Sequence, residues 1–206
     1  MTAPATAKTL DAAALHRLFD QAHTTHTFTD EPVSPDLIAE AYQHMRWAPT
    51  AFNSQPLRLT LLTPGAKREE VVEHFIEANR AKTLAAPLTI IAAYAPDWHE
   101  HMELLAPQRE GARESFAAKP QMRETVGRQS GSIQVGYLLL GLRAVGLEVG
   151  PMTGLNPEGV DSVIHTENGW KTLVAINVGH APNPEDEAAI RPRGGRLEFS
   201  QAAQVL

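Results

Sequence analysis

The chain of 206 residues contains no cysteine. Disulfide bonds, thiolate metal sites and cysteine nucleophiles are therefore excluded, and the absence suits a reducing cytoplasm. If the protein carries out redox chemistry, that chemistry must be carried by a bound cofactor.

An excess of basic residues is also missing. Lysine and arginine number 18 against 24 aspartate and glutamate residues, which gives a formal net charge of -6. This balance argues against general nucleic-acid binding and against adhesion to an acidic membrane surface. No apolar run approaches membrane-spanning length, and residues 1–9 lack the features of a secretory signal. We expect a cytoplasmic protein with neither nucleic-acid nor membrane partners, in which a local basic cluster holds any bound anion.

The composition is that of a folded domain. Hydrophobic residues make up 43% of the chain and charged residues 20%. The sequence has no internal repeat and no low-complexity linker. We therefore expect a flexible N-terminus over residues 1–9 and a single domain over residues 10–206.

Proline and glycine divide the chain into helical and extended segments. Asp11 and Ser34 are suited to cap two of the helices, the second with Pro35 at its first position. Apolar periodicity predicts helices over 11–22, 34–45, 67–79 and 125–145, a short helix from 156, and strands over 57–63, 88–93 and 172–178. Segments in this order predict an α+β fold with helices around one central sheet.

The segment between Pro49 and Pro56 places small polar side chains just before a strand. The prolines fix the backbone at both ends, and Thr50, Asn53 and Gln55, together with Ser54, offer donors and acceptors of the kind that a polyol or phosphate requires. An ordinary capped turn explains the same composition.

Asn79 and Lys82 are three positions apart on one helical face, where they could address one edge of a planar ligand. The amide of Asn79 suits an imide edge, and Lys82 suits nearby negative charge. The alternative is a lysine that simply stabilises a helix C-terminus through the dipole.

A glycine stands at each end of the segment 150–154, which reads as a rigid loop. Its inner residues are Pro151, Met152 and Thr153, and the flanking glycines permit close approach of the backbone to a ligand. An N–H group of Thr153 or Gly154 would then face a ligand ring, although a plain connection to the next helix is the default interpretation.

Arg191 and Arg193 are separated by a proline, so in an extended segment their side chains leave on the same side. Two guanidinium groups in an otherwise acidic protein suit a terminal phosphate. A solvated basic turn paired with the acidic residues at 185–187 is the alternative.

Taken together, these four motifs resemble the nitroreductase superfamily of flavin enzymes in their order and rough spacing. The resemblance covers about residues 10–206. The segments 47–50, 144–154 and 196–199 are most similar to the short branch of malonic semialdehyde reductases of pyrimidine degradation.

The resemblance implies a nitroreductase-like fold with a mostly antiparallel central sheet, an intertwined homodimer, and FMN held between the two subunits. It places Arg191 and Arg193 at the phosphate, and Asn79 and Lys82 at the pyrimidine edge of the flavin. It places the N–H groups of Thr153 and Gly154, after Pro151 and Met152, at the flavin N5. Residues Pro49, Thr50, Asn53 and Gln55 would reach the cofactor from the partner subunit.

One segment departs from the family pattern. Where many relatives have two arginines that grip the phosphate and ribityl chain, this sequence has His23, Thr24, Thr25 and His26. Because the reference pKa of histidine is about 6.5, the charge at this side of the phosphate would depend on pH. We expect looser FMN retention at pH 8.5 than at pH 6.5.

The implied reaction is ping-pong hydride transfer from NADH or NADPH through FMN to a small-molecule acceptor, with malonic semialdehyde as one candidate. Lys82 would stabilise the reduced flavin, beside Thr153 and Gly154. A general nitro or quinone reductase and a non-catalytic flavin-binding protein remain open as alternatives. His99 and His101 alternate with acidic residues, but spacing supplies no third metal ligand, so we expect no metal site. The segment 97–109 suits a lid in which Trp98 touches substrate.

Overall fold

A computed structural model of the chain describes residues 9–181 and 194–206, and a four-stranded sheet lies at its centre. The strand order is β1-β2-β4-β3, and every neighbouring pair is antiparallel. The strands are β1 (Leu57–Leu62), β2 (Leu88–Tyr94), β3 (Glu148–Met152) and β4 (Lys171–Gly179). The sheet agrees with the α+β fold predicted from the sequence.

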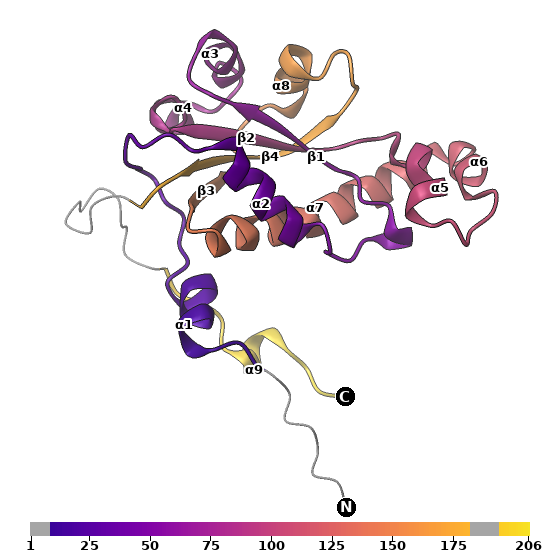
Figure 1. Cartoon of the computed structure of the whole chain (residues 1–206), viewed down its shortest axis with the longest axis horizontal. Coiled ribbons are helices and arrows are strands. Elements are labelled where there is room, and N and C mark those ends of the chain that lie inside the picture. The colour runs from indigo at the N-terminus through magenta and orange to yellow at the C-terminus, as the bar shows by residue number, and fades with distance from the viewer. Residues whose placement is uncertain (1–8, 182–193) are drawn as a thin grey trace, which may run out of the picture.

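Helices cover both faces of the sheet (Figure 1). The helices α3 (Ala66–Val72), α4 (Glu77–Ala85) and α8 (Pro157–Ile164) lie on one face, and α2 (Pro35–Met45) and α7 (Pro120–Ala144) lie on the other. The shorter elements are α1 (Ala12–Leu15), the π-helix η1 (His16–Asp20), η2 (Ala51–Asn53), η3 (Trp98–His101), α5 (Met102–Leu105), α6 (Ala112–Ala117) and α9 (Phe199–Ala202).

Strand β2 is buried along its whole length, and its side chains alternate between two cores. Ile90 belongs to the cluster that includes Leu138 and Leu142 of α7, whereas Ile91 belongs to the cluster that includes Val71 of α3 and Val160 of α8. This alternation follows from the two-residue period of a strand. The run of β-branched and small apolar residues in β2 therefore serves both faces of the sheet.

The long helix α7 supports the sheet from below in Figure 1 and crosses α2 closely. A side chain at Gly141 of α7 would bring its Cβ within 2.9 Å of the Ala41 carbonyl oxygen of α2, so this crossing needs glycine. The helix begins at Pro120, five positions before the predicted start at 125. Proline is favoured at a first helical position because its missing N–H has no helical partner there.

The predicted helix caps are confirmed. The Asp11 carboxylate accepts a hydrogen bond from the Ala14 N–H at 2.7 Å, and the Ser34 hydroxyl accepts one from the Asp36 N–H at 3.1 Å. Each bond satisfies a donor that the first helical turn leaves open.

Two predicted helices are interrupted. The helix expected over 67–79 is two helices, because Phe75 leaves the helical path to form an antiparallel bridge with Leu155 and is buried there. The helix expected over 11–22 ends at Asp20 and changes from α to π geometry, with the Gln21 N–H bonded to the His16 carbonyl at 2.8 Å.

The segment predicted as a loop from Gly150 onward is largely a strand, since β3 extends to Met152. Gly150 pairs with Asn177 of β4, and its Cα faces the backbone carbonyl of Thr25 with no room for a side chain. The Thr25 N–H bonds the Val149 carbonyl at 3.0 Å. The outer edge of β3 is thus covered by the segment that contains His23 and His26.

A small lobe formed by η3, α5 and α6 lies at the end of α7 (Figure 1). Its core consists of Trp98, Met102, Ala106, Phe116 and Val126. Trp98 has no exposed surface, and its indole N–H donates to the Arg123 carbonyl at 3.0 Å. The prediction that Trp98 touches substrate from a lid is therefore wrong in this structure.

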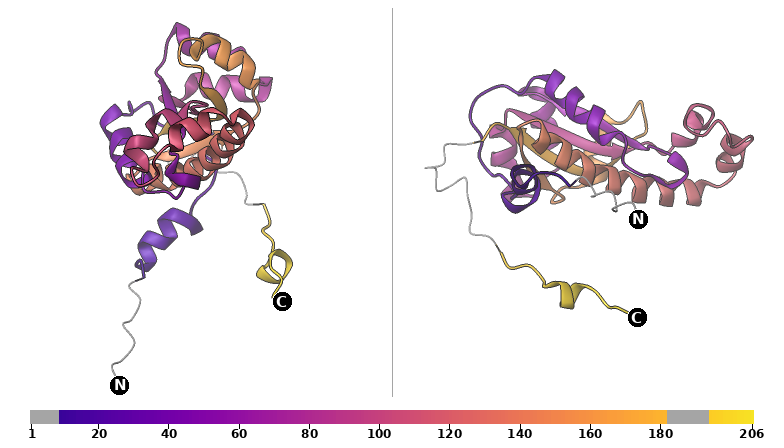
Figure 2. Two further views of the ribbon diagram at one scale, coloured as in Figure 1. Left: turned by 90° about the vertical axis from the view of Figure 1, so that its right-hand side faces the viewer. Right: turned by 60° about the horizontal axis from the view of Figure 1, so that its bottom comes forward.

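The described parts of both terminal regions extend away from the layered body (Figure 2). They expose large apolar side chains, among them Phe19 of η1 and Phe199 of α9. Within the described ranges, none of the helices combines the length and apolar character needed to cross a bilayer.

Candidate functional site

A cavity of about 390 Å³ lies between α4 and the segment that follows His26. Its lining residues are His26, Thr27, Phe28, Asp30, Ala81, Lys82 and Ala85. Phe28 and two alanines supply apolar surface, while Lys82 and His26 supply polar groups. A mostly apolar hollow with a few polar groups is typical of a small-molecule site.

Asn79 lies one turn before Lys82 on α4 and is buried. Its side-chain Nδ2 donates to the Gly154 carbonyl at 3.0 Å. A Cβ at position 154 would lie 2.6 Å from that same Nδ2 atom, so any larger residue there would displace the Asn79 amide. The structure thus brings together Asn79, Lys82 and Gly154, three residues that the sequence analysis placed in one site. Part of the Asn79 amide is used to join α4 to the chain after β3.

A polar network holds α4 against the sheet beside this junction. The Thr83 hydroxyl donates to the Asn79 carbonyl at 2.8 Å and lies 3.7 Å from the Met152 sulfur. The Asn177 side chain of β4 donates to the Thr83 hydroxyl at 3.2 Å and to the Lys82 carbonyl at 3.3 Å. The backbone that carries Lys82 is therefore fixed by buried contacts.

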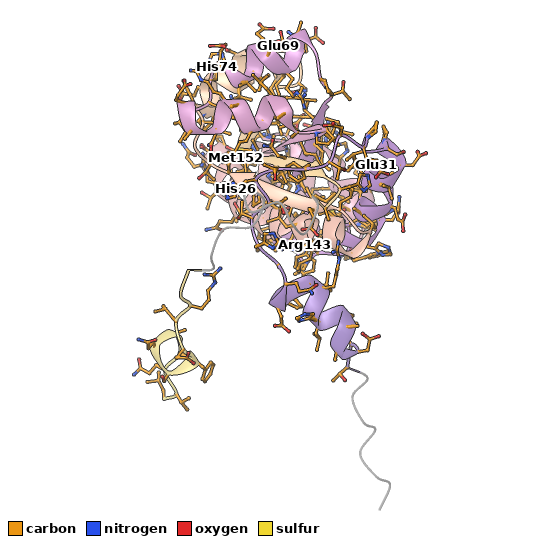
Figure 3. All side chains as sticks on the ribbon, turned by 90° about the vertical axis from the view of Figure 1, so that its left-hand side faces the viewer. His26, Glu31, Glu69, His74, Arg143 and Met152 are labelled. Carbon is orange, nitrogen blue, oxygen red and sulfur yellow. The ribbon has the colours of Figure 1, made fainter. Side chains whose placement is uncertain are left out.

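The predicted residues of β3 lie at the same end of the molecule as His26. Figure 3 looks onto this end and labels Met152 and His26. Pro151 and Met152 form the last part of β3, and Thr153 follows directly before Gly154. The rim of the candidate site therefore comes from α4, from the end of β3 and from the segment beside His26.

The two histidines of the segment 23–26 line different cavities. His26 lines the cavity with Lys82, whereas His23 lines a second one together with Arg17 and Arg143. Thr24 between them is exposed, and Thr25 is buried against β3. The sequence analysis treats the four residues as one anion-binding segment, but the fold places its two histidines in different cavities.

The loop with Thr50, Asn53 and Gln55 is internally bonded. The Gln55 N–H donates to the Thr50 hydroxyl at 3.2 Å, and the Gln55 side chain donates to the Asn53 side-chain oxygen at 3.0 Å. Phe52, Asn53 and Gln55 have φ values of 60°, 55° and 38°, although none is glycine. Positive φ at such residues costs free energy and persists where the surroundings impose it.

The small lobe imposes this loop conformation. The Phe52 ring lies 5.0 Å from the Phe116 ring and 5.4 Å from the Arg109 guanidinium, and the Asn53 side chain donates to the Leu105 carbonyl at 2.7 Å. The lobe and its loop lie at the opposite end of the molecule from α4 (Figure 1). One chain alone therefore does not bring Thr50, Asn53 and Gln55 to the Lys82 cavity.

The predicted anion clamp of Arg191 and Arg193 lies outside the described residues. Nearby, Arg196 is described, and its guanidinium donates to the carbonyls of Gly194 and Gly195 at 3.1 and 2.9 Å. The role of the clamp stays a prediction.

A larger cavity, of about 610 Å³, lies between α7, α8 and the start of β4. Its basic side chains are Arg123, Arg128 and Lys171, and its acidic side chains are Glu124, Glu158 and Asp161. Burial raises the pKa of Tyr94 on its wall, although Arg128 opposes the shift. The residues predicted to bind a ligand do not line this cavity, and its balanced charges favour no one ligand class.

The sequence analysis did not identify Thr27, Phe28 and Asp30, which complete the wall opposite Lys82. It also did not identify Arg17 and Arg143, which line a cavity together with His23. Proximity to His26 is a usable signal for the first group. The second group depends on how η1 and the end of α7 pack, which local sequence does not specify.

Comparisons with known proteins identify the family of the chain. The family model described as "Nitroreductase family" matches residues 20–180. A protein of Leptothrix cholodnii with the provisional name NADH dehydrogenase/NAD(P)H nitroreductase is 39% identical over 197 residues, which cover 96% of this chain and 98% of that protein.

Solved structures share the fold at low sequence identity. A nitroreductase family protein from Streptococcus pneumoniae superposes with a TM-score of 0.76 at 20% identity, covering 92% of this chain and 98% of the other. A provisionally named nitroreductase from Exiguobacterium sibiricum, solved in complex with FMN, superposes with a TM-score of 0.79 at 14% identity, covering 97% of this chain and all of the other.

Proposed function

The chain belongs to the nitroreductase family, and from this premise we propose that it is an FMN-dependent oxidoreductase that uses NADH or NADPH to reduce a small acceptor. The junction of Asn79, Lys82 and Gly154 carries the proposal, because it joins three predicted site residues at one end of the sheet. The nitroreductase names of the relatives and the FMN complex of a structural neighbour support it.

The residues present fit FMN. The cavity beside Lys82 is mostly apolar with a cationic group at its wall, as the flat ring of a flavin requires. Glycine at 154 lets the side chains of Asn79 and Ile76 pack directly against the main chain, which holds the Asn79 amide beside Lys82. Lys82 and Asn79 would hold the pyrimidine edge, with His26 beside the ribityl chain.

When bound, FMN supplies the hydride chemistry. The protein supplies position and charge. The ammonium group of Lys82 would stabilise negative charge that reduction places on the pyrimidine edge. The main-chain N–H groups of Thr153 and Gly154 would donate to the ring, and the apolar wall formed by Phe28 would exclude water from one side.

A second copy of the chain would complete the site. The loop with Thr50, Asn53 and Gln55 is held far from the Lys82 cavity of its own chain (Figure 1). A twofold pairing of identical chains would let the loop of one chain cover the flavin of the other. The proposal therefore includes a homodimer with two equivalent sites.

The acceptor is proposed on narrower grounds. The resemblance of the segments 144–154 and 196–199 to malonic semialdehyde reductases supports a small semialdehyde, which would be reduced to 3-hydroxypropionate. Steady-state rates with malonic semialdehyde, a quinone and a nitroaromatic compound compare this proposal directly with a general reductase. A kcat/KM highest for malonic semialdehyde supports it, and a clear preference for either other acceptor contradicts it.

The function is tested on the purified chain under anaerobic conditions. We expect a yellow protein whose flavin absorbance bleaches promptly when NADH or NADPH is added. A chain that retains FMN without bleaching would be a flavin-binding protein that does not turn over. A chain that binds neither FMN nor riboflavin would contradict the proposal altogether.

A further inference from the structure

A second cavity, of about 410 Å³, lies beside His23, at the other end of the segment 23–26 from the Lys82 cavity. Its wall is formed by η1, by the end of α7 and by the first residue of β3. The lining residues are Arg17, Asp20, Gln21, Ala22, His23, Arg143 and Glu148. The proposed function has so far used none of its basic residues.

Two guanidinium groups converge on this cavity. Arg17 Nη1 donates to the Glu148 carboxylate at 3.1 Å, and Arg17 Nε donates to the Arg143 carbonyl at 3.3 Å. Arg143 Nη2 donates to the His23 carbonyl at 3.1 Å. Arg143 Nε is buried and has no acceptor among the described residues.

The described residues of the cavity therefore leave guanidinium donors available to a ligand. Two guanidinium groups offer about ten N–H donors between them, and the bonds named above use few of them. The buried Arg143 Nε is the donor whose lack of an acceptor is costly, and a phosphate group offers several strong acceptor oxygens to such a pair. An oxyanion is the ligand that this donor set suits.

The acidic residues of the cavity are already paired. Glu148 accepts bonds from Arg17 and, at 3.4 Å, from the Thr25 hydroxyl, while the exposed Asp20 lies 3.5 Å from His16. Burial lowers the pKa of Arg143, Glu148 opposes this shift, and the neighbouring charge of Arg17 adds to it. Two neighbouring cations lie near one partly buried carboxylate, and a bound anion would relieve their repulsion.

The segment 23–26 connects this cavity to the proposed flavin pocket. His23 lines this cavity, and His26, three residues later, lines the cavity with Lys82. Three extended residues span at most about 10 Å, which is comparable to the reach of the five-carbon ribityl chain between the ring and the phosphate of FMN. Figure 3 shows His26 and Arg143 at the same end of the molecule.

We propose that Arg17 and Arg143 bind the phosphomonoester of the flavin nucleotide. They would supply, from η1 and α7, the two guanidinium groups that the segment 23–26 lacks by comparison with the family pattern. This inference rests on the proposed function and extends it by naming a phosphate receptor within the described chain.

Comparison of FMN with riboflavin tests the proposal, because riboflavin lacks the phosphate. The full-length chain is depleted of flavin and titrated with each compound while quenching of flavin fluorescence is followed. The variants are Arg17→Gln, Arg143→Gln and, as a matched surface control, Lys67→Gln, whose partner is Glu70 on α3. We expect the Kd for FMN to rise about tenfold in Arg17→Gln, with the Kd for riboflavin unchanged.

Arg17→Gln decides the outcome if Arg143→Gln fails to fold, because the Arg17 side chain is partly exposed and its loss leaves no cavity in the core. Equal weakening of FMN and riboflavin would assign Arg17 a structural role and overturn the proposal. An unchanged Kd for FMN in both folded variants would overturn it as well.

A pH series separates the arginines from the histidines. If His23 and His26 balance the phosphate charge, FMN binds less tightly at pH 8.5 than at pH 6.5, and the arginine variants bind FMN as tightly as the unmodified chain. That result would refute the proposal that Arg17 and Arg143 bind the phosphate. If the arginines balance the phosphate charge, the preference for FMN over riboflavin persists at pH 8.5 and falls in Arg17→Gln. Failure of the unmodified chain to bind either FMN or riboflavin would contradict the proposed function, and this inference would fail with it.

Discussion

Lys82 is the charged side chain that the candidate site depends on most directly. Its backbone is fixed by the Asn177 contact while its side chain lines the cavity. Substitution Lys82→Ala removes the charge without disturbing a buried core, so we expect little change in thermal stability. The rate of flavin reduction by NAD(P)H should fall about tenfold or more, within the range for loss of one electrostatic stabiliser.

Stopped-flow absorbance measures this rate, and Lys67→Ala on the exposed surface of α3 is the matched control. Reduction of the Lys82→Ala protein at the unmodified rate would remove Lys82 from this role.

His99 links protonation to the stability of the small lobe. The side chain is buried, and that burial is the main reason why the pKa of His99 is lowered. The charge of Arg123, whose Nη1 lies 3.2 Å from His99 Nε2, lowers the pKa further, while Glu100 and Asp97 oppose the shift. The folded state disfavours the protonated His99 ring. The stability that the neutral ring allows is therefore full above the unfolded pKa of about 6.5, and it is lost as the pH falls from that value through the lower pKa of the folded state.

We therefore expect the unfolding midpoint of the unmodified chain to drop more between pH 7.5 and pH 5.5 than that of His99→Gln. Differential scanning calorimetry at the two pH values gives the comparison. Parallel decreases in both proteins would show that His99 does not contribute to the acid sensitivity.

At the scale of elements, the small lobe holds the loop that contains Phe52 in its strained conformation. Phe52 has positive φ and is held by Phe116 and Arg109. Both Phe52→Ala and Phe52→Gly remove the ring, but glycine adopts positive φ without the penalty that alanine bears. We expect the glycine variant to be more stable than the alanine variant by about 1 kcal/mol, as measured by urea unfolding.

The two Phe52 variants control for each other, since the lost ring contacts are the same in both. An alanine variant as stable as the glycine variant would mean that the loop relaxes to negative φ once the ring is gone.

Local signals in the sequence were sufficient for some elements and not for others. The caps at Asp11 and Ser34 and the apolar strand 88–93 are encoded within a few residues, and the structure confirms them. The break between α3 and α4 depends on Phe75 pairing with Leu155, eighty positions away. Periodicity contains no information about such a partner. Gly150 likewise lies in a strand because it pairs with Asn177, which the local sequence does not indicate.

The candidate site shows the same division. Asn79, Lys82 and Gly154 were identified from residue type and spacing, and the fold brings them together. Arg17 and Arg143 could not be identified, because they come to line one cavity with His23 only through the packing of η1 against α7. Local sequence reports what a residue can bind, whereas the tertiary fold decides which residues share a cavity.

At the scale of the whole molecule, exposed apolar side chains suggest how two copies meet. Ile133 and Tyr137 lie one turn apart on α7 and are exposed, as is Trp47 after α2. Solvent-exposed apolar residues grouped on one helix face are typical of an interface. We expect a dimer by size-exclusion chromatography with light scattering, and a monomer for the double variant Ile133→Asp/Tyr137→Asp.

The monomeric variant should also lose FMN, because the proposed site needs the loop of the second chain. Leu61→Asp on the edge strand β1 is the control and should remain dimeric and yellow. A monomer that retains FMN with unchanged affinity would show that one chain is sufficient for cofactor binding.

The strand order β1-β2-β4-β3 has a consequence for biosynthesis. Strand β4, the last to leave the ribosome, lies between β2 and β3 and is hydrogen-bonded to both. A nascent chain that ends before Lys171 leaves one edge of β2 and one edge of β3 unpaired, and both are competent to capture a neighbouring nascent chain. Completion of the sheet must therefore wait until β4 itself has been translated, whichever of the other strands have already paired.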